Sequence, residues 1–253
     1  MTVGHQRINK IYSPNYDNRF KGTEVRFLIL HYTACDFETA LKYLTRESED
    51  NPVSAHYLID VDGRIVQLVD EEKRAWHAGI SQWGTYQNLN TWSIGIELVN
   101  MGHELGYTAF PELQMQSLIM LSHTILRRHP IPPQHVLGHS DIAPLRKRDP
   151  GELLDWRRLA REGIGLQPKT VCPSMPFDPY KARILLNQIG YDIDLDGTLD
   201  EKLIKVLKAF CMRCAPKEVS LQNLHAIMGI LKEYNRLQNR TNPIIKNCKK
   251  PGA

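Results

Sequence analysis

Three side chains that can do chemistry lie close together in the segment 138–151. They are the imidazole of His139, the ammonium of Lys147 and the carboxylate of Asp149. Prolines within the segment make it too irregular for a helix. We therefore expect a loop, the kind of element on which a scaffold usually presents functional groups. A loop of this length can bring His139 and Asp149 onto one metal ion.

A third metal ligand would have to come from elsewhere, and His31 is the best donor because it ends the apolar run 25–30. Two His and one carboxylate, with a fourth position left to water, are typical of a catalytic zinc site. Each residue also has an ordinary explanation. A His after an apolar run is often a packing residue, and an Asp before Pro-Gly is often a turn former.

Glu97 lies within the alternating apolar stretch 94–99, which predicts a strand buried on at least one face. An unpaired carboxylate is costly in such a place. We favour a general base whose pKa is raised by burial over a Glu that faces solvent or pairs with an Arg.

Two further segments fit a site of this kind. The pair Asp62 and Gly63 between alternating apolar runs predicts a hairpin. In the loop 74–79, Trp76 stands beside His77. This pair suits stacking on a sugar ring with hydrogen bonds to its substituents, although ordinary packing explains it too.

Six blocks in order along the chain resemble the zinc-dependent N-acetylmuramoyl-L-alanine amidases (amidase_2 family), and within them the bacterial branch of AmiD and AmpD. The blocks are residues 30–34, 54–57, 64–67, 74–79, 93–97 and 138–144. The resemblance implies an α/β fold, a mixed central β-sheet flanked by helices, with one Zn²⁺ per chain in a groove at the edge of the sheet.

The resemblance also implies roles for the residues above. His31, His139 and Asp149 would be the zinc ligands. Glu97 would activate the zinc-bound water and return its proton to the leaving amine, and Lys147 would stabilise the oxyanion. Lys147 has a second explanation, as part of a solvated basic run at 146–148.

The expected partner is peptidoglycan or a muropeptide, and the residues expected to contact it are Arg64, Trp76, His77, Asn88 and Asn90. Two positions depart from the family pattern. Ala55 stands where many relatives have an assisting Tyr, so more of the proton transfer falls on Glu97. Asn88 stands where the nearest bacterial relatives have an Arg, which puts a tight grip on a stem-peptide carboxylate in doubt. His56 is expected to be structural or to support a metal ligand, and not to bind the metal itself.

The length of 253 residues leaves room for a catalytic domain at 1–165, a Pro-rich linker at 166–176 and a helical domain at 177–253 with a mobile tail. Apolar spacing predicts a long helix after Pro111, shorter helices at 37–46 and 156–165, and three helices in 177–236. The last three are similar to the peptidoglycan-binding domain often joined to these amidases.

The net charge of +4 is spread out, with no basic block interleaved with aromatics, so a nucleic-acid partner has no support. No apolar run is long enough to span a membrane. The five cysteines do not form a disulfide framework. Likeness to AmiD favours a cell-envelope (periplasmic) or secreted protein, whereas residues 1–10 lack the apolar core of a signal peptide and favour the cytoplasm. We expect a monomer.

We favour hydrolysis of the amide bond between N-acetylmuramic, or 1,6-anhydro-N-acetylmuramic, acid and the L-alanine of the stem peptide. The main alternative is a non-catalytic peptidoglycan-recognition protein on the same fold. Such receptors characteristically lose a zinc ligand, and this chain keeps all three candidates. A zinc peptidase that cuts within the stem peptide is a further alternative.

Overall fold

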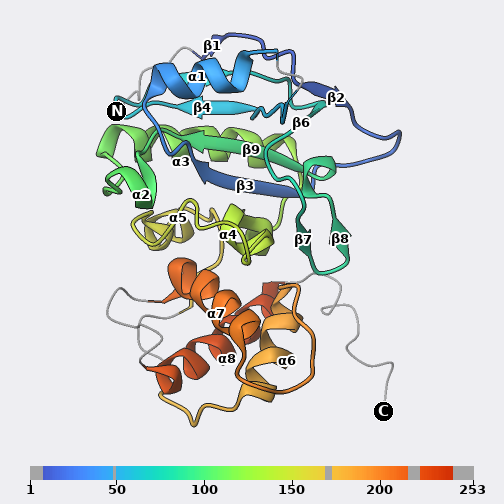
Figure 1. The fold of residues 1–253 in the computed structure, drawn as a ribbon, viewed down its shortest axis with the longest axis vertical. Coiled ribbons are helices and arrows are strands. Elements are labelled where there is room, and N and C mark those ends of the chain that lie inside the picture. Colours follow the sequence, from blue (N-terminus) through green and yellow to red (C-terminus); the bar gives the residue numbers. More distant parts are fainter. Residues whose placement is uncertain (1–7, 48–49, 169–172, 216–222, 242–253) are drawn as a thin grey trace.

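A mixed six-stranded sheet forms the centre of the protein, whose computed structural model describes residues 8–47, 50–168, 173–215 and 223–241 (Figure 1). Only the β4–β5 pair is antiparallel, as the hairpin at Asp62 and Gly63 predicts, and the other neighbours in the sheet run parallel. The α/β fold with a mixed sheet is therefore confirmed. The strand order is β1 (Asn9–Lys10), β5 (Ile65–Gln67), β4 (Tyr57–Ile59), β9 (Ser93–Leu98), β3 (Phe27–Tyr32) and β10 (Val136–Gly138).

Helices cover both faces of this sheet. Helices α3 (Glu112–Arg128) and α5 (Trp156–Arg161) pack on one face, where they bury the alternate residues Leu28 and Leu30 of β3. Helix α1 (Phe37–Thr45) packs on the other face at the β4–β5 end. The expected helices at 37–46 and after Pro111 are confirmed. The one expected at 156–165 ends earlier, at Arg161, and turns with positive-φ glycines follow it.

Three helices from the C-terminal part pack below the sheet in Figure 1. They are α6 (Pro179–Ile189), α7 (Glu201–Cys214) and α8 (Leu224–Thr241), and we call them the helical region. Asp178 and Asp200 cap α6 and α7 with side chains that accept backbone N–H bonds. The three expected helices are present. The first residues of the expected tail form the last turn of α8, and residues 242–253 of the tail lie outside the described residues.

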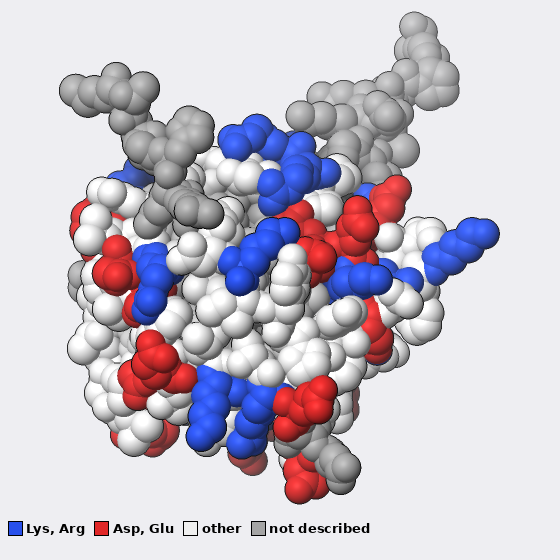
Figure 2. Space-filling view, turned by 90° about the horizontal axis from the view of Figure 1, so that it is seen from above, with Lys and Arg blue, Asp and Glu red and all other residues white. Residues whose placement is uncertain are grey.

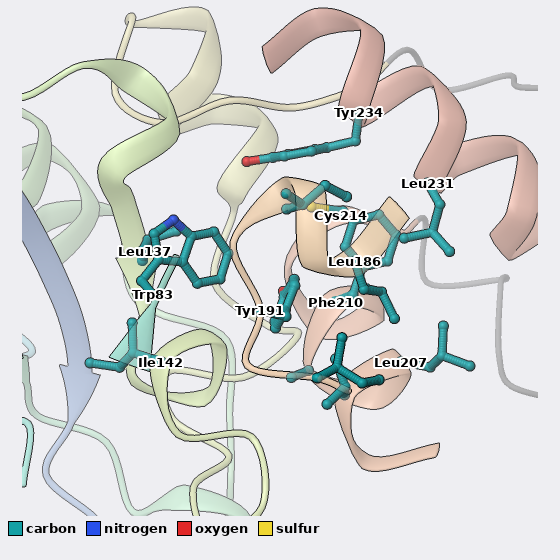
Figure 3. Packing of buried hydrophobic residues seen from close by; sticks show 14 of the residues in the cluster. Trp83, Leu137, Ile142, Leu186, Tyr191, Leu207, Phe210, Cys214, Leu231 and Tyr234 are labelled. Carbon is teal, nitrogen blue, oxygen red and sulfur yellow. The ribbon is translucent and has the colours of Figure 1, made fainter. Parts of the chain in front are cut away.

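The helical region and the sheet share one buried hydrophobic cluster. Phe27, Ile29 and Leu137 contribute from the sheet, and the buried faces of α6, α7 and α8 contribute from the helical region. Figure 3 shows Trp83 and Ile142 facing Tyr191 and the helices across this boundary. The helices are thus packed onto the sheet.

The remaining elements are short and lie around the sheet. They are β2 (Tyr16–Asn18) with β6 (Lys73–Ala75), β7 (Gln82–Trp83) with β8 (Tyr86–Gln87), α2 (Gly102–Leu105), α4 (His139–Ile142), η1 (Leu89–Thr91) and η2 (Pro133–His135). None of the helices in the described ranges is long and apolar enough to cross a membrane. Lys and Arg alternate with Asp and Glu on the face seen in Figure 2.

Candidate metal centre and groove

His31, His139 and Asp149 converge on one point, although more than a hundred residues separate the first from the second. His31 is the second-last residue of β3, and His139 begins α4 directly after the neighbouring strand β10. The segment 138–151 is therefore not wholly a loop as expected, since it begins with one helical turn. His31 Nδ1 lies 3.0 Å from His139 Nδ1, and each lies 3.1 Å from Asp149 Oδ2.

The spacing of these three atoms fits a small divalent cation. Ligand atoms about 2.0–2.2 Å from a tetrahedral zinc lie roughly 3.3–3.5 Å from one another, close to the distances seen here. All three residues are buried, and together they could hold a metal ion. The donor set of two imidazole nitrogens and one carboxylate oxygen is one that zinc accepts.

The surroundings of His139 determine which of its ring nitrogens carries the proton. Its Nε2 lies 3.1 Å from the carbonyl oxygen of Ala78. A carbonyl oxygen can only accept, so Nε2–H donates to it and Nδ1 keeps its lone pair for the metal. Metal-binding imidazoles are commonly oriented by such a second hydrogen bond.

A longer chain of hydrogen bonds assigns the tautomer of His31 in the same way. Ser93 Oγ donates to the carbonyl oxygen of Leu89 at 2.5 Å, and it therefore accepts from His77 Nε2, 3.2 Å away. His77 Nδ1 is then an acceptor, and it receives Nε2–H of His31 at 2.9 Å. The Nδ1 lone pair of His31 is left facing His139 and Asp149.

Gly95 explains how the ring of His77 fits behind His31. A Cβ atom at Gly95 would lie 2.5 Å from Cγ of His77, so only a glycine leaves room for the ring. A glycine inside a strand often marks such a close approach. It is the sequence signal that could have indicated the orienting role of His77.

The protonation states of the ligands suit a metal. Burial and the neighbouring His139 lower the pKa of His31 to about 4, although Asp149 acts in the opposite direction. Burial acts to raise the pKa of Asp149, but the adjacent imidazoles of His139 and His31 outweigh it and hold this pKa well below its usual range. Metal ligands have to be deprotonated, and this environment favours a neutral His31 and an ionised Asp149.

Glu97 lies beside the three ligands on the neighbouring strand β9. Its Oε1 is 4.0 Å from His31 Nδ1, and its Oε2 is buried with no hydrogen-bond partner within the described residues. Burial raises the pKa of Glu97 to about 8, Asp149 raises it as well, and Lys147 acts to lower it. With this raised pKa, the carboxyl of Glu97 can take up and release a proton near neutral pH.

A groove of about 450 Å³ opens over the metal ligands. Its lining includes Glu97, Lys147 and Trp76. Arg146 and Arg148, on either side of Lys147, are engaged by the carbonyl oxygen of Ile80 and by the carboxylate of Glu104. Among the described residues no carboxylate forms an ion pair with Lys147, whose positive charge acts on Glu97 at the groove.

The other residues expected to contact substrate lie in different settings. His77 reaches the groove only from behind His31, and Asn90 Oδ1 accepts the backbone N–H groups of His77 and Ala78, at 3.0 and 2.7 Å. Asn90 therefore shapes the loop that presents the Ala78 carbonyl. Asn88 is exposed and lines a second hollow next to the groove.

Arg64 is not among the residues that line either hollow. It forms an ion pair with Asp60 at 2.7 Å, and its guanidinium stacks 3.8 Å above the ring of Phe37. This side chain already has partners within the hairpin and on α1.

His56 is buried behind the site, as expected of a structural residue. Its Nδ1 accepts the Gly95 N–H at 3.0 Å, and its Nε2 donates to the carbonyl oxygen of Lys73 at 3.1 Å. Burial and the nearby Arg19 lower its pKa to about 3. Both ring nitrogens are used, which leaves His56 out of the ligand set.

Known proteins share this architecture. AmiD of Escherichia coli (strain K12), an N-acetylmuramoyl-L-alanine amidase, is 40% identical over 213 residues, which cover 76% of this chain and 75% of AmiD. The solved complex of AmiD with anhydro-N-acetylmuramic acid-L-Ala-D-gamma-Glu-L-Lys has a TM-score of 0.72 at 35% identity and covers 85% of this chain and 92% of AmiD.

Two more relatives extend the comparison. AmpDh3 from Pseudomonas aeruginosa, in complex with anhydromuramic pentapeptide, has a TM-score of 0.74 at 32% identity over 94% of this chain and 99% of its own. The 1,6-anhydro-N-acetylmuramyl-L-alanine amidase AmpD of Haemophilus influenzae is 34% identical over 59% of this chain and 88% of its own. The family model of N-acetylmuramoyl-L-alanine amidases matches residues 21–152. By this match and by the geometry of its site, the chain belongs to the N-acetylmuramoyl-L-alanine amidase family.

Proposed function

We propose that the protein is a zinc-dependent hydrolase of the amide bond between N-acetylmuramic, or 1,6-anhydro-N-acetylmuramic, acid and L-alanine. The observation that carries the proposal is the triangle of His31 Nδ1, His139 Nδ1 and Asp149 Oδ2. These are three acceptor atoms in close contact, and a cation is what satisfies them. Zinc held by them would polarise the amide carbonyl and make a water more acidic.

Glu97 is the proton carrier in this proposal. Its unpartnered Oε2 takes the proton of the attacking water and then delivers it to the alanine nitrogen as the amide bond breaks. With a pKa raised to about 8, the carboxyl binds and releases this proton near neutral pH. The products are the free sugar acid and a peptide with a new amino terminus.

Lys147 and Trp76 supply the remaining interactions. Lys147 lines the groove, and in this proposal its ammonium stabilises the negative charge that develops on the carbonyl oxygen. Trp76 is half-buried at the groove and offers a flat apolar surface to a sugar ring or to the stem peptide. Asn88, in the adjoining hollow, contacts the part of the substrate that extends beyond the groove.

The substrate class is supported by the relatives that were solved with anhydromuramyl peptides. Mass spectrometry of a soluble anhydro-muropeptide incubated with zinc-loaded protein tests the reaction directly. Release of intact sugar and free stem peptide is the expected result. Binding without cleavage would support the receptor, and cleavage inside the stem peptide would support a peptidase.

Intact sacculi form the second arm of this experiment. Turnover on sacculi indicates an enzyme of the wall polymer, whereas turnover only on soluble fragments indicates recycling. The domain limits 1–165, 166–176 and 177–253, the wall-binding role of the helical region, the monomeric state and the location in the cell envelope stay predictions. Cell fractionation tests the last of them.

A further inference from the structure

The two fully buried arginines of the helical region have different partners. Arg183 of α6 pairs with Asp194 and Asp200, which belong to the same region. Arg213 of α7 pairs instead with Asp141, which lies in α4 on the catalytic side. Arg183 is 0% exposed and Arg213 is 3% exposed, so both charges are removed from water and depend on these partners.

Asp141 is the meeting point of the two parts of the molecule. Its Oδ2 accepts the backbone N–H of Gly138 at 2.8 Å and lies 2.8 Å from Arg213 Nε. The contact with Arg213 is an ion pair and not a hydrogen bond, since Arg213 Nε has no hydrogen-bond partner within the described residues. Oδ1 of Asp141 accepts the hydroxyl of Tyr191 from the helical region. The carboxylate is 1% exposed.

The same carboxylate fixes the start of α4, and His139 is the first residue of this helix. Gly138 is the residue at the junction of β10 and α4. A helix of a single turn has little stability of its own. The position of His139 therefore depends on the groups that hold α4. Among them, the Asp141 carboxylate accepts from Gly138 on one side and contacts Arg213 and Tyr191 on the other.

Further contacts around Asp141 and Arg213 hold the helical region against the catalytic side. Gly84 N–H donates to the carbonyl oxygen of Gly190 at 2.6 Å, and a Cβ atom at Gly190 would lie 2.5 Å from the ring of Trp83. The ring of Tyr191 meets Trp83 edge to face, 4.8 Å between centroids. Figure 3 shows these side chains at the boundary. Arg213 Nη1 also donates to Tyr234 at 2.8 Å.

We propose that Arg213 and Tyr191 are positioning residues for the metal centre, acting through Asp141 on α4 and His139. The helical region is then part of the scaffold of the zinc site, in addition to any contact it makes with the wall. This inference rests on the proposed zinc-dependent function. Removal of Arg213 leaves a buried carboxylate with fewer partners, so α4 shifts and the ligand triangle is distorted.

The test compares Arg213→Met with Arg183→Met in the 253-residue protein. Both variants remove a buried arginine of the helical region, and only the first touches α4. Zinc affinity is measured by competition with a chromophoric chelator, and site geometry by the visible absorption of the Co²⁺-substituted protein. Circular dichroism reports whether each variant is folded.

We expect Arg213→Met to bind zinc about 10- to 100-fold more weakly, the usual effect of removing a group that orients a ligand, with an altered Co²⁺ spectrum. Arg183→Met should lower the melting temperature and leave zinc affinity and spectrum unchanged. Arg213→Lys, which keeps the charge, should recover part of the affinity. If Arg213→Met does not fold, Tyr191→Phe takes its place, with a smaller loss of affinity expected.

Two results would overturn the proposal. One is wild-type zinc affinity and an unchanged Co²⁺ spectrum in Arg213→Met, or in Tyr191→Phe where that variant replaces it. The other is an equal loss of affinity in Arg183→Met, which would show general destabilisation. Failure of the unaltered protein to bind zinc would instead refute the proposed function.

Discussion

His31 and Glu97 are direct register partners on the adjacent parallel strands β3 and β9, with His31 Nδ1 4.0 Å from Glu97 Oε1. Paired positions of neighbouring strands project their side chains to the same face of a sheet. The distance between the proposed metal ligand His31 and the proposed base Glu97 is therefore set by the backbone pairing of the two strands. Leu30 and Leu98 on the opposite face are fully buried and hold both strands in place.

Replacement of this base should separate catalysis from metal binding. Glu97→Gln keeps the shape of the side chain but cannot take the proton of water, so we expect kcat to fall by about 10²–10⁴-fold. Zinc content, measured by atomic emission, should stay at one ion per chain. Activity near the wild-type level in the zinc-loaded variant would remove Glu97 from the mechanism.

The same variant has a second, pH-dependent consequence for the metal-free protein. Folding raises the pKa of Glu97 from 4.5 to about 8, so the folded state binds this proton more tightly than the unfolded chain. The resulting contribution to stability is complete below pH 4.5 and is lost as the pH rises through 8. Above that pH, the lost contribution is on the order of a few kcal/mol.

Urea unfolding with a chelator present measures this difference. Glu97→Gln carries no ionisable group at this position, so it should gain stability relative to the wild type between pH 5 and pH 9. The comparison of two proteins at each pH cancels the titration of the other buried groups. A constant difference across this range would mean that Glu97 is not buried in its neutral form.

The hydrogen-bond chain behind His31 should control metal affinity. In Ser93→Ala the hydroxyl that accepts from His77 is lost, and in His77→Ala the partner of His31 Nε2 is lost. We expect zinc to bind about 10- to 100-fold more weakly in each. Gly95→Ala should have a similar effect, because the added methyl displaces the ring of His77. Competition titrations that give wild-type affinity for all three variants would contradict the assigned tautomers.

Removal of the metal should abolish turnover and lower stability together. Zinc at 100 times its dissociation constant contributes about 2.7 kcal/mol, which is about 5–10 °C in the melting temperature of a chain of this size. Both properties should return on addition of Zn²⁺ but not of Mg²⁺, which prefers oxygen ligands. A melting temperature that changes neither with the chelator nor with added Zn²⁺ would argue against a metal site at His31, His139 and Asp149.

Arg64→Ala serves as a control outside the groove. Its ion pair with Asp60 is partly exposed, and such pairs contribute at most about 1 kcal/mol. We expect a small loss of stability and an unchanged kcat/KM on muropeptide. A large rise in KM would instead indicate that Arg64 contacts the substrate.

The sequence by itself indicated the longer helices, the strand around Glu97 and the residues that we propose for the chemistry. The alternation at 94–99 predicted β9, Pro111 predicted the start of α3, and the pair Asp62 and Gly63 predicted the β4–β5 hairpin. These signals are local, because strand and helix periodicity is written in neighbouring residues. The candidate metal ligands were chosen by residue type, and the structure brings all three together in a group that could hold a metal ion.

Only the tertiary structure decided what the neighbouring polar residues do. His77 and Asn90 resembled substrate contacts, but packing turns one towards His31 and the other towards the backbone of its own loop. Asp141 and Arg213 are 72 residues apart, and no periodicity links them. The direction of a side chain and its distant partner depend on how the elements pack. The sequence predicted a helical domain that follows a linker, whereas in the structure these helices share a buried cluster with the sheet.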